Sequence, residues 1–132
     1  MDLINKKNVP VFHSDHGESV YELTGQGVDQ NSAYSIANVV LLPEKMSKNH
    51  FHPRAEECYY ILSGEGEIQL NDKVMALQAH DFIRIPPTVW HQIRNRGDRV
   101  LEFVVFCQPA WTADCSVFEV DSTEDHSVNG SK

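Results

Sequence analysis

The sequence is short of the features that define several large protein classes. It has no apolar run near the roughly 20 residues that cross a bilayer, and residues 1–7 lack the apolar core of a secretory signal. Lysine and arginine number only 11, against 19 aspartates and glutamates. The resulting net charge of −8 repels nucleic acids and anionic membranes. We therefore expect no membrane partner, no nucleic-acid partner and a cytoplasmic location.

Cysteine is also scarce. Cys58, Cys107 and Cys115 form an odd number without paired spacing, which favours reduced thiols over a disulfide scaffold. We expect all three to be buried and unreactive. The position of Cys107 in the last long strand is also consistent with a side chain that points into the interior of the fold.

The remaining composition is typical of one globular domain. With 41% hydrophobic and 23% charged residues over 132 positions, the chain can bury roughly two thirds of its unfolded surface. Short β-rich segments alternate with turn signals, and no stretch combines a helical period with caps. We predict an all-β fold, a single antiparallel β-barrel or jelly roll over residues 1–120. Residues 1–20 would form an N-terminal edge strand and loop, and residues 121–132 a disordered tail.

The expected strands follow from apolar runs and from the turns that bound them. In the last long strand, 99–107, we expect Glu102 to face outward. Because side chains alternate along a strand, Leu101, Phe103 and Val105 should then face the interior. The segments are 9–12, 20–23, 34–42, 57–62, 67–70, 73–77, 82–85, 90–94, 99–107 and 117–120.

Four side chains with metal-binding atoms lie between residues 49 and 95. His50 and His52 are two apart on a strand and share a face, and a turn over 53–55 can bring Glu57 to that face. His91 must return from a later strand. Three imidazoles and a carboxylate suit a divalent transition metal such as iron, manganese, nickel, copper or zinc, whereas calcium and magnesium prefer more oxygen. The alternative is a polar interior without metal, although four buried ionisable groups need partners of some kind.

At these residues the chain resembles the cupins. The first cupin motif is a glycine, a His-x-His pair, a glutamate and a second glycine at set intervals, and the second motif ends in a histidine and an asparagine. The matching positions are His50, His52, Glu57 and Gly64 in the first motif and Pro86, His91 and Asn95 in the second. The resemblance implies a double-stranded β-helix in which the two histidines of the pair, the glutamate and the later histidine bind the metal.

Three glycines of the cupin motifs are absent. Glu44, His80 and Thr88 stand in their places. Because glycine at a turn usually serves a positive φ, we expect these loops to turn differently from those of the family. His80 would then be a surface turn residue.

Several other side chains near the predicted site have open roles. Tyr59 has the parity of Glu57 and is our candidate catalytic residue, as a proton donor or hydrogen bond to substrate, with a packed tyrosine as the alternative. Trp111 could cover the pocket or pack against a second subunit. His13 and His16 are more consistent with loop histidines near solvent than with additional ligands.

Alternation also separates the aromatic residues of this region from the ligands. Phe51, Tyr60 and Trp90 should face away from the metal and serve as core or interface residues.

Three histidines and one carboxylate leave coordination positions open, as in catalytic metal sites. The resemblance therefore implies a metal-dependent enzyme acting on a small oxygenated molecule, with dioxygenation, isomerisation, decarboxylation and lyase chemistry all open. One alternative is a non-catalytic module that binds or senses a small ligand. The other is a metal-free sugar epimerase, which would use a histidine and aspartate pair. The resemblance also implies a homodimer, with Cys58, Tyr60 and the N-terminal strand as candidate contacts.

Overall fold

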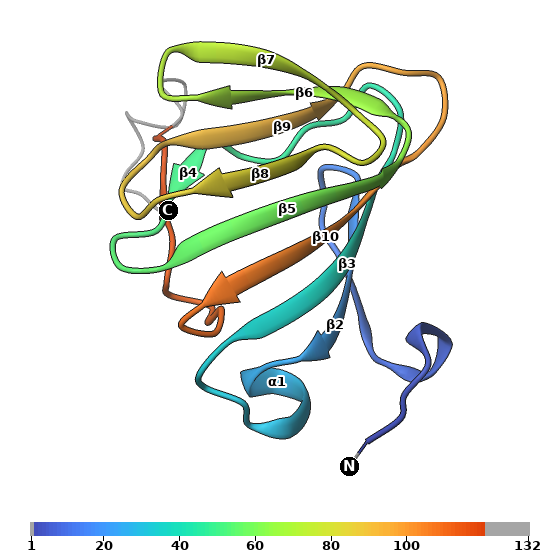
Figure 1. Cartoon of the computed structure of the whole chain (residues 1–132), viewed down its shortest axis with the longest axis vertical. Coiled ribbons are helices and arrows are strands. Elements are labelled where there is room, and N and C mark those ends of the chain that lie inside the picture. The colour runs from blue at the N-terminus through green and yellow to red at the C-terminus, as the bar shows by residue number, and fades with distance from the viewer. Residues whose placement is uncertain (1, 121–132) are drawn as a thin grey trace.

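The chain forms two antiparallel sheets that face each other, in a computed structural model that describes residues 2–120 (Figure 1). The predicted all-β jelly-roll barrel is thus confirmed. The six-stranded sheet has the order β1 (Val11–His13), β2 (Glu18–Thr24), β3 (Ser35–Leu41), β10 (Leu101–Gln108), β5 (Glu56–Ser63) and β8 (Phe82–Ile85). The five-stranded sheet has the order β11 (Val117–Phe118), β4 (His50–Phe51), β9 (His91–Asn95), β6 (Glu65–Leu70) and β7 (Lys73–Gln78).

The expected strands are present to within about two residues at most ends, the usual uncertainty of such boundaries. The sequence did not indicate two short helices, the 3-10 turn η1 (Lys6–Asn8) and the single turn α1 (Gln26–Asp29). Within residues 2–120, no helix has the length and hydrophobicity to cross a membrane. The tail predicted over 121–132 lies outside the described residues.

A compact apolar core fills the space between the sheets. Leu41, Ile61, Ile68 and Leu101 are fully buried there, and Phe103 is 1% exposed. Strand alternation explains the arrangement, because every second residue of β10 points inward.

Glu102, the outward residue of β10, accepts hydrogen bonds from Lys6 and from the side-chain amide of Asn38. The predicted inward facing of Leu101 and Phe103, with Val105 packed against the core, is confirmed.

Turn geometry at the three replaced glycines differs from our expectation. Glu44, His80 and Thr88 all adopt positive φ, at 64°, 77° and 73°. The prediction that these loops turn differently was therefore wrong, because the left-handed backbone remains although the side chain has changed. The retained turn has a consequence for the site, since the backbone N–H of Thr88 donates to the carbonyl of His52 (2.8 Å).

Two motif residues that cannot bind metal hold the frame of the barrel. Gly64 has a φ of +95°, and a Cβ there would lie 2.5 Å from the carbonyl oxygen of Val100. The fully buried Asn95 donates from its amide to the carbonyls of Leu41 and Arg99. Gly64 and Asn95 lie where β5 and β9 end, and they stabilise that end of the barrel. The predicted ligands Glu57 and His91 lie at the other end, where these two strands begin.

Candidate metal centre

The four predicted ligands come from three strand regions that the fold brings to one end of the barrel. His50 on β4 pairs directly with His91, the first residue of β9. His52 follows two residues later, and Glu57 is the second residue of β5, where it pairs with Cys107 of β10. Antiparallel strand pairing thus brings residues that are far apart in the sequence close together in space.

One ligand atom from each of the four side chains lies within 4.8 Å of the other three. His52, Glu57 and His91 are buried, and His50 is half-buried. The rings of His50 and His91 have centroids 4.2 Å apart, and those of His52 and His91 are 5.5 Å apart. The structure therefore gathers the predicted set in one place.

The second nitrogen of each imidazole fixes how the ring is turned. Every Nδ1 lies within hydrogen-bond distance of a backbone carbonyl, to which a protonated Nδ1 donates, and this leaves Nε2 free to face the cluster. The three contacts are His50 to Lys48 (2.9 Å), His52 to Cys115 (3.2 Å) and His91 to Val89 (2.9 Å).

In this arrangement two imidazole nitrogens crowd one carboxylate oxygen. Oε1 of Glu57 lies 3.2 Å from Nε2 of His52 and 2.9 Å from Nε2 of His91. If Nδ1 carries the proton of each neutral ring, both Nε2 atoms present lone pairs to the carboxylate. A cation, either a proton or a metal ion, is needed between them.

The titration behaviour of the cluster reflects this crowding. Burial would lower the pKa of His52, but its hydrogen bonds with Cys115 and Glu57 outweigh burial and raise the pKa to about 10. Burial would raise the pKa of Glu57, but the two histidines bonded to it lower the pKa to about 2. In the absence of metal, a proton on His52 thus balances the charge of Glu57.

His50 behaves in the opposite way. Burial, with the neighbouring His91, lowers the pKa of His50 to about 4. Its imidazole is therefore neutral at neutral pH, which is the state in which an imidazole binds a metal. A metal that enters must therefore displace the proton of His52, whereas His50 has none to lose.

Tyr59 lies on the interior wall beside the cluster. Its hydroxyl donates to Oε1 of Glu57 (3.4 Å), and its ring packs on Phe103 at 5.1 Å. Burial, followed by the charges of Glu57 and Glu18, raises the pKa of Tyr59 well above its usual value. Tyr59 is therefore a protonated donor, and its catalytic role stays a prediction.

The aromatic residues expected to face away from the cluster do so. Phe51 packs edge-on against Trp90 (4.7 Å between ring centroids). Tyr60 is 41% exposed and lies within hydrogen-bond distance of His80, which is exposed as predicted.

The expectation that all three thiols are buried holds only for Cys107, because Cys58 and Cys115 are half-buried. Cys107 is buried, and burial with the charge of Glu57 raises the pKa of its thiol. Cys115 contradicts the expectation of a buried, unreactive thiol, because it is half-buried and its Sγ lies 3.6 Å from Nδ1 of His52. Burial opposes ionisation there, but the contact with His52 lowers the pKa of Cys115.

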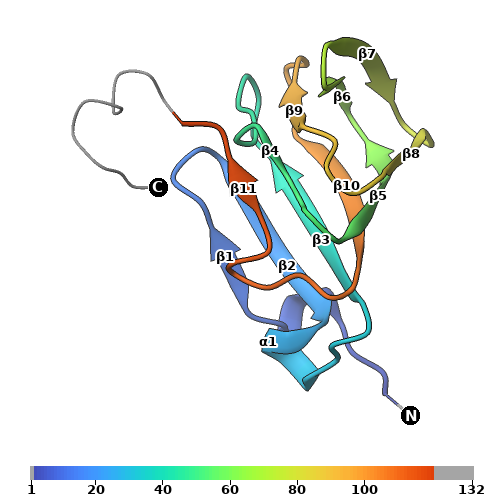
Figure 2. The same ribbon diagram turned by 90° about the vertical axis from the view of Figure 1, so that its left-hand side faces the viewer.

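The segment from Cys115 to β11 forms a strap over the histidines. The sequence indicated a strand over 117–120 but not its contact with His50 and His52. In Figure 2 the chain leaves β10 and returns to place β11 beside β4. Oγ of Ser116 lies 3.3 Å from Nδ1 of His52, and the ring of Phe118 lies 5.7 Å from that of His50. No motif marks this strap, because its residues are more than 60 positions from the histidines they contact.

Two hollows adjoin the strap and the neighbouring loops. The larger, of about 370 Å³, lies between Arg54, Ala55, Pro109 and Cys115 among others. Trp111 is 46% exposed and lines the second hollow with Glu22. This position does not support a lid over the four ligand residues, which line neither hollow.

The other histidines stay outside the cluster. His13 is exposed on β1 within 2.9 Å of the Ser19 hydroxyl, and His16 lies in the turn between β1 and β2, half-buried against Glu18. The expectation that neither belongs to the ligand set is consistent with this placement.

Comparison with known proteins places this site in context. The family described as "Cupin domain" matches residues 37–107, a segment that contains all four predicted ligands. An "Oxalate-binding protein" of Thermotoga maritima is 35% identical over 74 residues, 56% of this chain and 61% of that protein. The chain likewise covers less than two thirds of several other relatives, down to 17% of one.

Solved structures show the same fold. A protein of Thermotoga maritima described as a predicted oxalate decarboxylase superposes with a TM-score of 0.74 at 24% identity, over 82% of this chain and 99% of that one. The oxalate decarboxylase of Bacillus subtilis, in a study of its Mn(II) centres, superposes with a TM-score of 0.71 at 22% identity, over 94% of this chain and 35% of that one.

Proposed function

The chain belongs to the cupin domain family, and on this premise we propose that it binds a divalent transition metal through His50, His52, Glu57 and His91. We further propose that the metal holds a small oxygenated organic molecule and that the protein is an enzyme acting on it. A manganese ion is the first candidate because a structural neighbour contains Mn(II) centres, and iron, nickel, copper and zinc remain open.

One observation carries the proposal. Each histidine of the cluster has a backbone carbonyl for its Nδ1, which leaves three Nε2 atoms and a carboxylate oxygen directed at one another. Neutral imidazoles whose Nδ1 atoms donate to backbone carbonyls have no proton on Nε2, so they present lone pairs to the carboxylate and cannot donate to it. A metal ion matches all four atoms at once.

In the proposed site, the metal and the side chains of the protein have different chemical roles. A bound divalent ion supplies Lewis acidity and, if redox-active, electron transfer to an oxidant. The chain orients the bound molecule and excludes water from it through a wall of three buried residues, Tyr59, Phe103 and Cys107. Tyr59 can donate a hydrogen bond or a proton from its hydroxyl to an oxygen of the bound molecule.

Oxalate is the first ligand to test. The support comes from the description of one relative as an oxalate-binding protein and of a neighbour as an oxalate decarboxylase. A small dicarboxylate presents two oxygens to a metal, so related hydroxy acids and diketones belong in the same panel. Binding without turnover across the panel would favour the alternative of a ligand-binding or sensing protein.

Metal content provides the primary test. Protein purified without chelator or nickel resin, and then reconstituted with Mn²⁺, should hold about one ion per chain by elemental analysis, as four donors at one point predict. His50→Ala and His91→Ala should lose the ion, whereas the exposed His80→Ala should keep it. Wild-type protein that stays metal-free after reconstitution with each candidate metal contradicts the proposal.

A further inference from the structure

His52 differs from the other two histidines of the cluster in what holds its ring. Nδ1 of His50 and Nδ1 of His91 each lie 2.9 Å from the carbonyl of the residue two positions earlier in the chain. Nδ1 of His52 instead lies 3.2 Å from the carbonyl of Cys115, a residue 63 positions away. The orientation of His52 therefore depends on the strap, whereas the other two rings are held locally.

Three atoms of the strap surround Nδ1 of His52. Besides the carbonyl of Cys115, the Sγ of the same residue lies at 3.6 Å and the Oγ of Ser116 at 3.3 Å. A hydroxyl and a thiol can either donate or accept, but a backbone carbonyl can only accept. The carbonyl therefore favours the neutral form of the ring in which Nδ1 carries the proton and Nε2, 3.2 Å from Oε1 of Glu57, has a free lone pair.

The rest of the fold fixes the backbone of His52 but leaves one side of its ring to the strap. The carbonyl of His52 accepts from the backbone N–H of Thr88 (2.8 Å). The side chain still has two rotatable bonds, and each rotamer points Nε2 in a different direction. The contacts with Cys115 and Ser116 therefore select the rotamer in which Nε2 meets Glu57.

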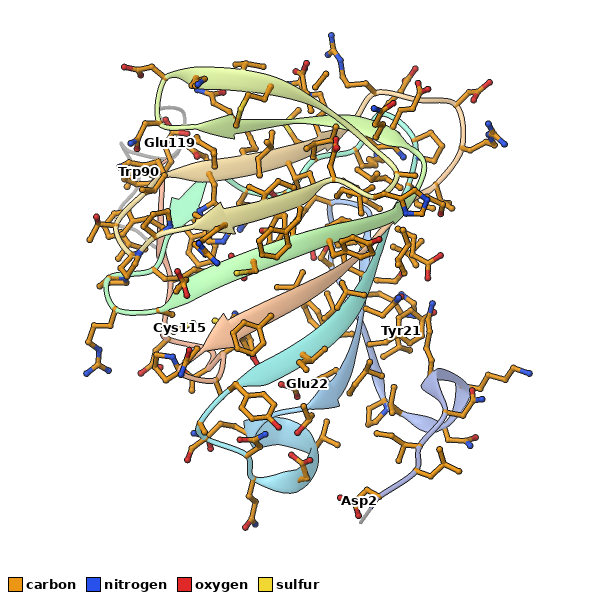
Figure 3. All side chains as sticks on the ribbon, in the orientation of Figure 1. Asp2, Tyr21, Glu22, Trp90, Cys115 and Glu119 are labelled. Atoms are coloured by element: carbon orange, nitrogen blue, oxygen red, sulfur yellow. The ribbon has the colours of Figure 1, made fainter. Side chains whose placement is uncertain are left out.

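The strap forms only a short strand on the barrel. β11 consists of Val117 and Phe118, which pair with β4 and are 41% and 43% exposed. Directly after it, the N–H of Glu119 donates to the carbonyl of Asn49 (3.0 Å). In Figure 3 the strap lies along one side of the barrel, between the labelled residues Cys115 and Glu119. A two-residue edge strand with exposed side chains belongs to the part of a fold that opens at small free-energy cost.

We propose that the strap is a positioning segment of the metal centre, and that strap docking and metal binding favour each other. The inference rests on the proposed metal site. With the strap docked, the carbonyl of Cys115 holds the ring of His52 with Nε2 directed at the ion. With the ion bound, the ring cannot turn away, and its Nδ1–H is a fixed donor for the strap. By linkage, the factor by which docking raises metal affinity equals the factor by which metal favours docking.

The first measurement is the affinity of full-length variants for Mn²⁺, by equilibrium dialysis below the melting temperature of each. Glu119→Pro removes the N–H that donates to Asn49 and should release the strap. We expect its dissociation constant to rise about tenfold or more, as when a metal-bound histidine loses the partner of its second nitrogen.

Two variants serve as matched controls. Glu119→Ala loses the side chain that accepts from Asn49 (3.3 Å) but keeps the backbone N–H. Cys115→Ala loses the thiol but keeps the carbonyl that contacts His52. Both should bind Mn²⁺ as tightly as the wild type.

The second measurement needs no variant and decides the question even if Glu119→Pro does not fold. Hydrogen exchange of the wild type is followed by mass spectrometry on a peptide that covers residues 115–119. Exchange there should slow by about tenfold or more at saturating Mn²⁺, the same factor as the change in affinity. The turn η1, closed by the hydrogen bond from Asn8 to Asn5, is the reference and should exchange equally with and without metal.

Two results overturn the inference. In one, Mn²⁺ binds the wild type but exchange over residues 115–119 is the same with and without it. In the other, Glu119→Pro exchanges faster over these residues and yet binds Mn²⁺ as tightly as the wild type, as expected of a strap that only stabilises the fold. Failure of the wild type to bind any candidate metal instead shows that the proposed metal site is wrong, and the inference falls with it.

Discussion

The protonation states of His50, His52 and Glu57 are set by burial together with the groups that each side chain contacts. His50 and His52 are two positions apart, yet the pKa of His50 is lowered to about 4 and that of His52 is raised to about 10. Burial, with the nearby ring of His91, lowers the pKa of His50, whereas hydrogen bonds with Cys115 and Glu57 outweigh burial at His52. Alternation along a strand indicates which way a residue faces, but not which charge it meets.

These states predict how the stability of the metal-free protein depends on pH. The raised pKa of His52 contributes stability that is complete below its unfolded pKa of about 6.5 and is lost as the pH rises through about 10. The lowered pKa of His50 acts in the opposite sense, so its contribution is lost as the pH falls from about 6.5 through about 4. In the presence of a chelator, the melting temperature should peak near neutrality, and the free energy of unfolding should change on either side by at most about 1.4 kcal/mol per pH unit per proton.

Single substitutions separate the two sides of this profile. His52→Gln should flatten the alkaline decrease, and His50→Gln should flatten the acidic one. Thermal melts followed by circular dichroism at several pH values provide the measurement. An alkaline decrease that persists in full in His52→Gln would contradict the assignment.

Tyr59 provides a prediction about chemistry at the same scale. Tyr59→Phe removes the hydroxyl that donates to Glu57 but keeps the ring on Phe103. We expect metal content to be unchanged, stability to fall by about 1 kcal/mol, as for one hydrogen bond, and turnover of the first active substrate to fall at least about tenfold if the hydroxyl supplies a proton.

The adjacent Tyr60→Phe is the matched control. Tyr60 points outward toward His80, so its hydroxyl should have no effect on turnover. Equal turnover in Tyr59→Phe and the wild type would reduce Tyr59 to a packing residue.

At the scale of elements, turns determine how accurately the strands position the predicted ligands. The carbonyl of His52 is held by the N–H of Thr88 in the loop that precedes His91. Thr88 achieves this with a φ of 73°, a conformation that is strained for a β-branched residue. The loop thus connects the segments of the predicted ligands His52 and His91, and the strained backbone of Thr88 costs stability.

Thr88→Gly should release this strain. Glycine adopts positive φ readily, so we expect the free energy of unfolding to rise by about 1 kcal/mol after its larger loss of entropy is included. Urea denaturation measures the change. Thr88→Ala keeps a Cβ at the same φ and should show a clearly smaller gain, whereas a less stable Thr88→Gly would show that the turn is not strained.

The sequence indicated the strands through alternation and the four predicted ligands through their motif spacing. It did not reveal the strap, since Cys115 reaches His52 through an irregular connection after β10. It did not show that Glu18 shares the inner face of the larger sheet with Leu41, its partner on β3, because the pairing register of β2 on β3 cannot be read from one strand. It also misjudged Thr88, because a glycine-like backbone can be imposed on another residue by its hydrogen bonds.

At the scale of the whole molecule, one face of the larger sheet remains apolar and uncovered in the described residues. Tyr60 and Phe82 pair side by side on β5 and β8, and with Leu62 they are between 37% and 57% exposed. β8 is the edge strand of this sheet, and exposed apolar edges favour association. Arg84 and Glu56 form an ion pair on the same two strands. In a twofold-symmetric dimer, each of these charges can face the opposite charge of the second copy.

We propose that a second copy of the chain covers this face and forms the homodimer. Each chain carries a net charge of −8, so the two copies repel each other at low salt, and screening by about 0.15 M salt should strengthen the dimer. Light scattering coupled to size-exclusion chromatography should show a dimer for the wild type and a monomer for Phe82→Glu.

Val74→Glu is the control, because Val74 is 55% exposed on β7 in the other sheet and its replacement adds the same charge. This variant should remain dimeric, since only the β5 and β8 face is buried by the partner. A monomeric wild type at every salt concentration, or equal dissociation of both variants, would show that the apolar face of β5 and β8 does not mediate self-association.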